Sequence, residues 1–460
     1  MSRRAGAAAA ASAVLAAGAG VGASAGAKRG AATAAAPAPG AWVGDEKRPC
    51  GPTAKDNRCL KDKDCCTNKC QKPGPGEKYG RCRCIKPGKK CTPKQICCGG
   101  ATCTGSVCTP PAPVCLPTVS ASGTAVANGV GLTAALAAAP AGATLILAPG
   151  QYAGDFSIQK DVTLTSCPGA GEVVVMNIAT YVDSTPVNQG RTFFVGVPPA
   201  SSSERQGRLV GPSLTLTGIT VTRNVASGLG GGIFVGEGAS LFLLGSTVIR
   251  GAQNKADGAG IEVISGNVYV GCDRVADPAC TDSVLIGDPD PGRTNRAISS
   301  DAAAIQVSSA SKVVIRGNAR LEGNIADGSG GAIYMTGTST VLVTDDAQIV
   351  NNAAGPADSR RGGAVRISGT SVLTLAGNAR ISGNSAYNGG AIYLTEADRL
   401  FITGGAVVSG NIALGTGGGI YMDPGTATPS GVSLATVFGN INGTCANFYT
   451  VSNTTCVTLT

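Results

Sequence analysis

The sequence contains no histidine. A Ser-His-Asp triad and a Cys-His pair are therefore excluded, and so are zinc and iron centres with histidine ligands. Any catalytic chemistry must use carboxylates, Lys, Arg, Tyr or an oxygen-bound metal.

Aromatic residues make up only 4% of the chain and charged residues 14%, whereas Gly occupies 68 of 460 positions. The Gly content is about twice its usual share of ~7%. This composition disfavours a coiled coil and the helical core of an enzyme. Because 43% of the residues are apolar and the net charge is only +9, we expect a folded chain rather than a disordered one.

The first 27 residues resemble an export signal. Arg3 and Arg4 precede a weakly apolar Ala/Gly stretch that ends in Ala25-Gly26-Ala27, a small-residue cleavage pattern. Residues 28–49 are typical of an Ala/Pro-rich linker. No later segment reaches the ~20 apolar residues of a transmembrane helix. We therefore expect a protein that is secreted, extracellular or at the cell surface, and not transmembrane.

The 18 cysteines, an even number, are typical of an oxidising compartment. Twelve of them lie between Cys50 and Cys108 in two frames, C-x8-C-x5-CC-x3-C-x11-C and C-x6-C-x5-CC-x4-C-x4-C. Segments this short cannot bury enough apolar surface to fold alone, so disulfides must supply the missing stability. Metal binding by thiolates is the competing interpretation, but the frames lack the paired CxxC spacing of zinc sites.

Each frame resembles the inhibitor-cystine-knot (knottin) framework. The resemblance implies tandem miniproteins over residues 50–108, before a Pro-rich linker over 109–118. It also implies the disulfides Cys50–Cys66, Cys59–Cys70, Cys65–Cys82, Cys84–Cys98, Cys91–Cys103 and Cys97–Cys108. Sequence alone leaves about 15 possible pairings in each frame, and knottin frames host toxins, inhibitors and carbohydrate binders alike.

Basic residues concentrate in the same region. Residues 45–108 carry 15 Lys or Arg against 6 Asp or Glu, whereas residues 109–460 carry 18 against 22. The basic module either presents a solvated face or binds an acidic partner, such as an anionic polysaccharide or a membrane surface. Nucleic acid is not an expected partner, because Tyr79 is the only aromatic residue of the module that could stack on a base.

From about residue 119 onward the sequence repeats itself. An aliphatic-x-x-Asn phrase recurs, and its last four steps are 28, 32, 27 and 29 residues; the copies end at Asn224, Asn324, Asn352, Asn384, Asn411 and Asn440. A second phrase, two Gly followed shortly by Ile or Val, comes after most copies, as in Gly330-Gly331-Ala332-Ile333. Short alternating strands such as Thr340–Val343 lie between them.

Each period holds about three strands, which are too short for helices. Three short strands form one rung of a solenoid, and rungs must stack to bury Ile and Val in internal columns. We interpret the Asn as a turn residue whose amide pairs with the Asn of the next rung, and the Gly pairs as tight corners. The predicted fold class is all-β, a right-handed parallel β-helix over residues 119–460.

These phrases resemble the repeats of chlamydial polymorphic outer-membrane proteins, with Val, Ile or Leu here in place of Phe in their FxxN phrase. The opening segments Gly131–Leu136 and Ala143–Tyr152 resemble the cap helix and first strand of the pectate-lyase-like superfamily. That architecture hosts lyases, hydrolases, adhesins and inert stalks. The resemblance therefore implies a fold but not one function.

A pectate-lyase-like enzyme would need Ca²⁺ held by converging carboxylates, together with an Arg or Lys base. The acidic insertion that ends at Asp301 is the candidate region, with Asp282, Asp288, Asp290 and Asp301 near Arg293 and Arg296. Asp288, Asp290 and Arg293 are the catalytic candidates. The alternative is an ordinary solvated loop closed by a Cys272–Cys280 disulfide. Without lyase activity, no cofactor is expected.

The binding candidate is a row of side chains. The residue that follows each Gly-Gly-x-Ile phrase is expected to point outward; along successive rungs these residues are Phe234, Glu262, Tyr334, Arg366, Tyr393 and Tyr421. With rungs ~4.8 Å apart, the aromatic members and Arg366 would bind an extended glycan, with rings stacked on sugar faces. Alternatively, aromatic residues simply suit exposed β positions.

We therefore expect an exported β-helix that binds a polysaccharide or cell-surface glycan, or mediates adhesion. A polysaccharide lyase or hydrolase is the alternative. The remaining cysteines are predicted to pair as Cys115–Cys167, Cys272–Cys280 and Cys445–Cys456. Neither the ligand nor the oligomeric state follows from the sequence.

Overall fold

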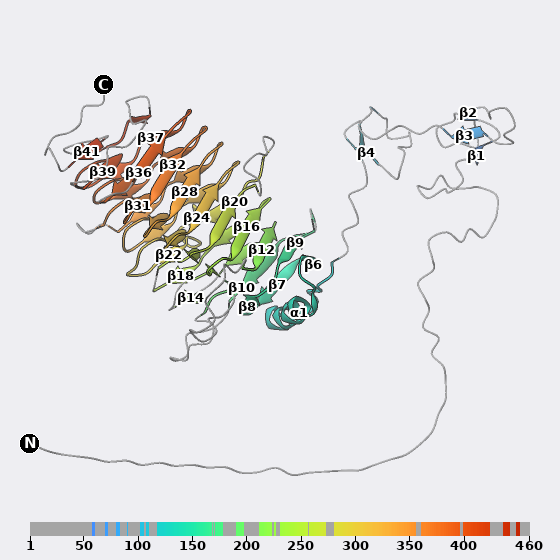
Figure 1. Ribbon diagram of the computed structural model, residues 1–460. Coiled ribbons are helices and arrows are strands. Elements are labelled where there is room, and N and C mark those ends of the chain that lie inside the picture. Colours follow the sequence, from blue (N-terminus) through green and yellow to red (C-terminus); the bar gives the residue numbers. More distant parts are fainter. Residues whose placement is uncertain are drawn as a thin grey trace, which may run out of the picture. The chain divides into compact units, whose positions relative to one another are not determined.

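Figure 1 shows the protein as a computed structural model. It describes residues 117–441 except 168, 170, 178–189, 197–210, 223–224, 227–230, 256, 273–279, 356–359, 396–398 and 424–435. Outside that range it describes Lys90 and the strands β1 to β5 and β41.

The chain divides into two compact units, residues 1–114 and 115–460. In the first unit, a small antiparallel sheet has the order β1 (Arg58–Cys59), β3 (Gly80–Cys82), β2 (Cys70–Gln71), and β4 (Thr102–Thr104) pairs with β5 (Val107–Thr109). The predicted export signal, the linker over 28–49 and the cysteine side chains of both knottin-like frames lie outside the described residues.

The second unit is built from four parallel sheets, which we number 1 to 4 in the order in which each rung visits them. Sheet 1 contains β7 (Gly150–Ala153), β10 (Val173–Met176), β13 (Thr220–Thr222), β17 (Val248–Arg250), β21 (Leu285–Gly287), β25 (Arg320–Glu322), β29 (Gln348–Val350), β33 (Arg380–Ser382), β37 (Val407–Ser409) and β40 (Val437–Phe438). Sheet 2 contains β14 (Val225–Ala226), β18 (Gln253–Asn254), β22 (Arg296–Ala297), β26 (Ile325–Ala326), β30 (Ala353–Ala354), β34 (Ser385–Ala386) and β38 (Ile412–Ala413).

Sheets 3 and 4 complete each rung. Sheet 3 contains β8 (Phe156–Ile158), β11 (Phe193–Val195), β15 (Ile233–Val235), β19 (Ile261–Ile264), β23 (Ile305–Ser308), β27 (Ile333–Met335), β31 (Val365–Ile367), β35 (Ile392–Leu394), β39 (Ile420–Met422) and β41 (Phe448–Thr450). Sheet 4 contains β6 (Ala143–Leu147), β9 (Val162–Ser166), β12 (Ser213–Thr217), β16 (Ser240–Leu244), β20 (Asn267–Val270), β24 (Lys312–Ile315), β28 (Thr340–Val343), β32 (Val372–Leu375) and β36 (Arg399–Ile402). Stacked parallel sheets confirm the predicted right-handed parallel β-helix.

Alternating strands bury β-branched side chains in columns along the axis. In sheet 3 one inward column is fully buried and consists of Ile233, Ile261, Ile305, Ile333, Val365, Ile392 and Ile420. Each rung contributes one such residue in register with the next. A rung alone would leave these side chains in water, so the hydrophobic effect stabilises the stack rather than the single repeat.

A single helix covers the first rungs. Within the described residues α1 (Ala125–Ala138) is the only helix, and it packs on β7. Thr124 is its N-cap and accepts a hydrogen bond from the backbone N–H of Ala127. Leu132 and Leu136 are buried beneath it. No helix of the described chain is long and apolar enough to cross a membrane.

The repeated Asn residues form a buried ladder where sheet 1 turns into sheet 2. The side-chain amide of each donates to the amide oxygen of the next, over 2.8–3.0 Å, in the series Asn295, Asn324, Asn352, Asn384, Asn411 and Asn440. Each amide also donates to a backbone carbonyl of the preceding rung, as Asn384 does to Ile349. The predicted pairing between rungs is therefore present from Asn324 onward, and Asn295 extends it by one rung.

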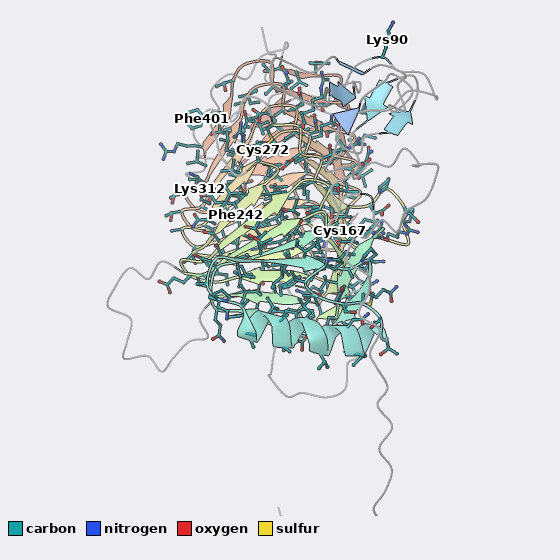
Figure 2. The ribbon with its side chains drawn as sticks, turned by 90° about the vertical axis from the view of Figure 1, so that its right-hand side faces the viewer. Lys90, Cys167, Phe242, Cys272, Lys312 and Phe401 are labelled. Carbon is teal, nitrogen blue, oxygen red and sulfur yellow. A yellow bond between two sulfur atoms is a disulfide. The ribbon has the colours of Figure 1, made fainter. Side chains whose placement is uncertain are left out.

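The outer face of sheet 4 carries aromatic and basic side chains. Phe242, Lys312 and Phe401 lie on three of its strands and point away from the core (Figure 2). Its nine strands contain no Asp or Glu.

Cys272 and Cys280 form a disulfide shortly after the end of β20, and Cys167 is disulfide-bonded to a partner outside the described residues.

Candidate functional site

Backbone register defines one continuous row on the outer side of sheet 3. Because strands alternate, the central residue of each strand points away from the Ile and Val column. These residues pair rung by rung and form what we call the sheet 3 row: Phe194, Phe234, Glu262, Gln306, Tyr334, Arg366, Tyr393 and Tyr421. All the binding residues expected from the sequence belong to it.

Aromatic members of the row stack on one another. The ring centroids of Phe194 and Phe234 are 5.4 Å apart with an interplanar angle of 8°. Those of Tyr393 and Tyr421 are 4.6 Å apart at 14°. Each ring therefore covers a face of its neighbour. The expectation that the rings offer their faces to sugars along the row does not fit this geometry.

Arginine side chains cover other ring faces. The guanidinium carbon of Arg191 lies 4.5 Å from the ring centre of Phe234. Arg361 lies 4.8 Å from the ring centre of Tyr393, and Arg366 lies 4.8 Å from that of Tyr334. These distances are typical of cation–π contacts.

Tyr393 was expected to point into solvent, and this expectation is wrong. Its side chain is only 1% exposed, because Arg361 covers the ring and its hydroxyl donates to Asp423 over 2.7 Å. Burial raises the pKa of Tyr393 well above its ordinary value, and the hydrogen bond to Asp423 raises it further. Phe234, Tyr334, Arg366 and Tyr421 are partly exposed.

The middle of the row is polar and buried. Glu262 is 2% exposed and Gln306 4% exposed. Gly258, which has a φ of +69°, lies above both of them, and a side-chain carbon there would come within 2.9–3.0 Å of their Cβ atoms. The row is thus divided into a phenylalanine part around Phe234 and an arginine-tyrosine part from Tyr334 to Tyr421.

Glycine pairs explain how the corners fit so closely over the row. Gly330 and Gly389 have φ values of +65° and +62°, a left-handed conformation that favours glycine. A Cβ at Gly389 would collide with the carbonyl of Ile392 and lie 3.2 Å from the Cβ of Tyr393. The predicted tight corners are therefore also close approaches to the row.

Three arginines gather at the arginine-tyrosine part of the row. Arg360 and Arg361 lie at the corner before β31, and Arg366 lies within β31. The nearest acidic atoms are at the limit of an ion pair: Arg366 Nη1 is 3.8 Å from Asp301 Oδ2, and Arg361 Nη1 is 4.0 Å from Asp423 Oδ2. Burial raises the pKa of the Asp301 carboxyl, although Ser329 and Arg366 act in the opposite direction.

The catalytic candidates do not form a catalytic cluster. Asp288 is nearly buried and its carboxylate lies 3.4 Å from Arg250, while it also accepts from the backbone N–H of Asp290. Asp290 forms an exposed ion pair with Arg293 over 3.6 Å. These carboxylates are thus occupied by cations and a turn amide, so they do not fit a calcium site.

The other acidic and basic residues of the insertion lie elsewhere. Arg296 pairs with Asp327 over 3.1 Å, and Asp301 faces Arg366 rather than Asp288. Among the side chains that the structure places, no group of three or more His, Cys, Asp or Glu residues is arranged to hold a metal ion. Asp288 and Asp301 therefore face different partners, although both belong to the insertion.

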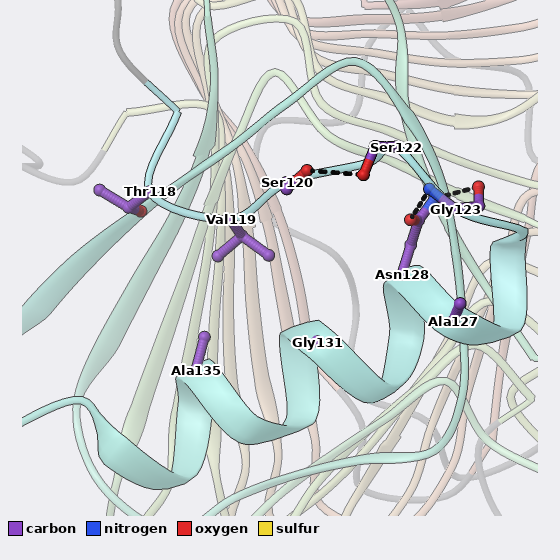
Figure 3. A pocket seen from close by; sticks show the side chains of 9 residues that line it. All are labelled: Thr118, Val119, Ser120, Ser122, Gly123, Ala127, Asn128, Gly131 and Ala135. Atoms are coloured by element: carbon purple, nitrogen blue, oxygen red, sulfur yellow. Dashed lines mark hydrogen bonds between the residues drawn. The ribbon is translucent and has the colours of Figure 1, made fainter. Parts of the chain in front are cut away.

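A groove of about 330 Å³ lies between the segment 118–123 and α1 (Figure 3). Its polar groups are paired with each other. Ser120 donates to Ser122 over 3.2 Å, and the Asn128 amide exchanges hydrogen bonds with the backbone of Gly123. A second groove of about 530 Å³, between α1 and β8, is lined by Asp155, Lys160 and mostly apolar residues. Neither groove contains an arrangement typical of a catalytic site.

Two segments of the chain, residues 318–336 and 378–395, match the Chlamydia polymorphic membrane protein (Chlamydia_PMP) repeat. Each match runs from a sheet 1 strand through sheet 2 to a sheet 3 strand: β25 to β27 in the first and β33 to β35 in the second. Comparisons with curated proteins and with solved structures found no match. The chain therefore contains repeats of the Chlamydia polymorphic membrane protein type, and the two matched segments form two rungs of a parallel β-helix with one further rung, β29 to β31, between them.

Proposed function

We propose that the protein is an exported surface protein that binds an extended glycan along the sheet 3 row and thereby mediates adhesion. The observation that carries this proposal is the in-register gathering of Tyr334, Arg366 and Tyr421 on one face, all partly exposed. Polar side chains that repeat along an axis suit a ligand that itself repeats.

The repeat match supports a location at the cell surface. The matched repeat is named for a membrane protein of Chlamydia, and the first 27 residues resemble an export signal. Polysaccharides and cell-surface glycans are extended ligands that a protein at this location would meet. The basic module over 45–108 is a second region that would attract such a partner if it is acidic.

Contacts with the glycan would be made by polar groups rather than by ring faces. The Tyr393 and Tyr421 rings cover one another, and Arg366 covers Tyr334. The partly exposed phenols of Tyr334 and Tyr421 and the guanidinium group of Arg366 remain on the outer side. We therefore propose recognition by hydrogen bonds and charge, with the glycan lying parallel to the axis of the β-helix.

No observation favours the alternative of a calcium-dependent lyase or a hydrolase. Asp288 is engaged by Arg250, and Asp290 by Arg293. A lyase would release unsaturated products from a polyuronate in the presence of Ca²⁺. Turnover of any polysaccharide by the purified full chain, with loss on Asp288→Ala, would overturn the proposal of a binding protein.

The direct test is a glycan array probed with the full chain and two double variants. Tyr334→Ser with Tyr421→Ser removes two partly exposed phenols of the row, and about 0.5–1.5 kcal/mol for each lost hydrogen bond corresponds to roughly 10-fold weaker binding. The control, Tyr269→Ser with Phe401→Ser, changes two partly exposed rings on sheet 4. Equal binding by both variants would refute the assignment to sheet 3.

A further inference from the structure

We propose that Arg360, Arg361 and Arg366 form an anion-binding centre that selects glycans carrying sulfate or carboxylate groups. We call these three residues the arginine centre. The anion site follows from the geometry, and its assignment to a glycan rests on the proposed function.

The first observation is a surplus of hydrogen-bond donors. A guanidinium group has five N–H donors and no acceptor. None of the three side chains donates a hydrogen bond to the protein within the described structure, and the Nε atoms of Arg361 and Arg366 are buried without a partner. These two atoms are closed to solvent, so an external acceptor would meet the outer guanidinium nitrogens, because the Arg361 and Arg366 side chains are 37% and 21% exposed.

The second observation is that the nearby acids balance charge without using these donors. Asp301 and Asp423 lie 3.8 and 4.0 Å from the arginine nitrogens, beyond the ~2.7–2.9 Å of a charge-assisted hydrogen bond. Asp301 accepts instead from the backbone N–H of Ser329, and Asp423 from the hydroxyl of Tyr393. The outer N–H groups of these guanidinium groups thus stay available for a ligand, whereas the Nε atoms of Arg361 and Arg366 are buried.

The third observation is that two of the arginines are held in place. Arg366 lies over the ring of Tyr334, and Arg361 lies over the ring of Tyr393. The backbone of Arg361 is tied at both sides, since its N–H donates to Ser329 Oγ over 3.3 Å and its carbonyl accepts from Gly330 over 2.9 Å. Side chains that are already oriented lose little entropy when they bind.

The chemistry of the ligand follows from the donors. Guanidinium groups bind planar carboxylates and tetrahedral oxyanions through paired N–H···O bonds. A sulfate ester or a uronate on an extended chain would meet these donors, whereas a neutral sugar would leave their charge unused. Arg366 was predictable because it occupies a strand position, whereas Arg360 and Arg361 lie at a corner that the strand pattern does not cover. The Arg-Arg pair directly before Gly362-Gly363 is the signal that marks them.

The test uses the full chain and four immobilised polymers: heparin, polygalacturonate, dextran sulfate and neutral dextran. We expect binding to the charged polymers and none to dextran. Arg361→Gln with Arg366→Gln should weaken binding to the charged polymers about 10-fold or more. The matched control is Arg380→Gln with Arg399→Gln, which removes two exposed arginines on sheets 1 and 4. The relative response to polygalacturonate and dextran sulfate separates carboxylate from sulfate as the natural anion.

The basic module over 45–108 would also attract polyanions, so the site must be mapped. Labelling of arginines with phenylglyoxal, followed by mass mapping, should show that heparin or inorganic sulfate protects Arg360, Arg361 and Arg366 but not Arg380. If charged and neutral polymers bind alike, the arginine centre is wrong while glycan binding stands. If no glycan binds but sulfate protects these arginines, the anion centre stands and the glycan proposal fails. Absence of protection by either ligand overturns the inference.

Discussion

The Asn ladder allows a sharp prediction about stability. Asn384 is fully buried; its amide oxygen accepts from the backbone N–H and the side-chain amide of Asn352, and its own amide donates to Ile349 and Asn411. Replacing Asn384 with Ala leaves two donors of Asn352 and the Ile349 carbonyl without this partner. At about 1–3 kcal/mol for each buried group left unsatisfied, the loss of unfolding free energy should be at least about 3 kcal/mol.

Urea unfolding followed by circular dichroism measures this loss, and hydrogen exchange locates it. Because neighbouring rungs stabilise one another, exchange should accelerate in β29, β33 and β37 before it does in β12 or β16. The matched control is Asn378→Ala, since Asn378 lies on an exposed turn and donates to Asp346 over 3.1 Å. That change should cost no more than about 0.5 kcal/mol. Similar losses in both variants would show that the ladder contributes nothing beyond an ordinary polar contact.

Three further predictions concern other parts of the fold. Gly389→Ala should lower the unfolding temperature more than Gly410→Ala: both residues have a positive φ, but only Gly389 would collide with a carbonyl, whereas nothing lies within 4 Å of a Cβ at Gly410. The raised pKa of Tyr393 means that the folded chain holds this proton more tightly, so stability should fall as pH rises above about 10. Denaturant titrations between pH 8 and 11, a range of about three units around that value, should show a weaker decline for Tyr393→Phe. Peptide mapping of the unreduced protein should recover crosslinks between Cys115 and Cys167 and between Cys445 and Cys456; free thiols at these positions would contradict the pairing.

Repetition made the fold predictable. Each rung repeats the same constraints, so the spacing of Asn and of Gly pairs was enough to predict the buried columns and the ladder. Asn295 was missed because an insertion separates it from the aliphatic residue Ile286. Phe194 and Gln306 were missed because their rungs lack the Gly pair. Each of them nevertheless lies between two buried apolar residues, and this alternation indicates a strand residue that points outward.

Burial on the outer face was not predictable in the same way. The strand pattern correctly indicated that Tyr393 points away from the core. Whether it meets solvent depends on Arg361, which comes from a corner of the preceding rung, and on Asp423, which follows β39. No local pattern in the sequence encodes such contacts between corners. For the same reason, acids that are close in the insertion, such as Asp288 and Asp301, face different partners in the fold.

The direction of the ladder gives the solenoid an internal polarity. In every amide from Asn295 to Asn411 one N–H donates to the amide oxygen of the next rung, and the amide oxygen accepts from the previous rung. The second N–H donates to a backbone carbonyl of the previous rung. The backbone N–H groups of Asn324, Asn352, Asn384 and Asn411 donate to the same oxygens, so a flipped amide would lose two bonds at once. The side-chain dipoles therefore add head to tail, with the positive end toward Asn440, and each bond polarises the next. A parallel sheet stack, which otherwise has little reason to distinguish its two ends electrically, acquires a dipole along its axis.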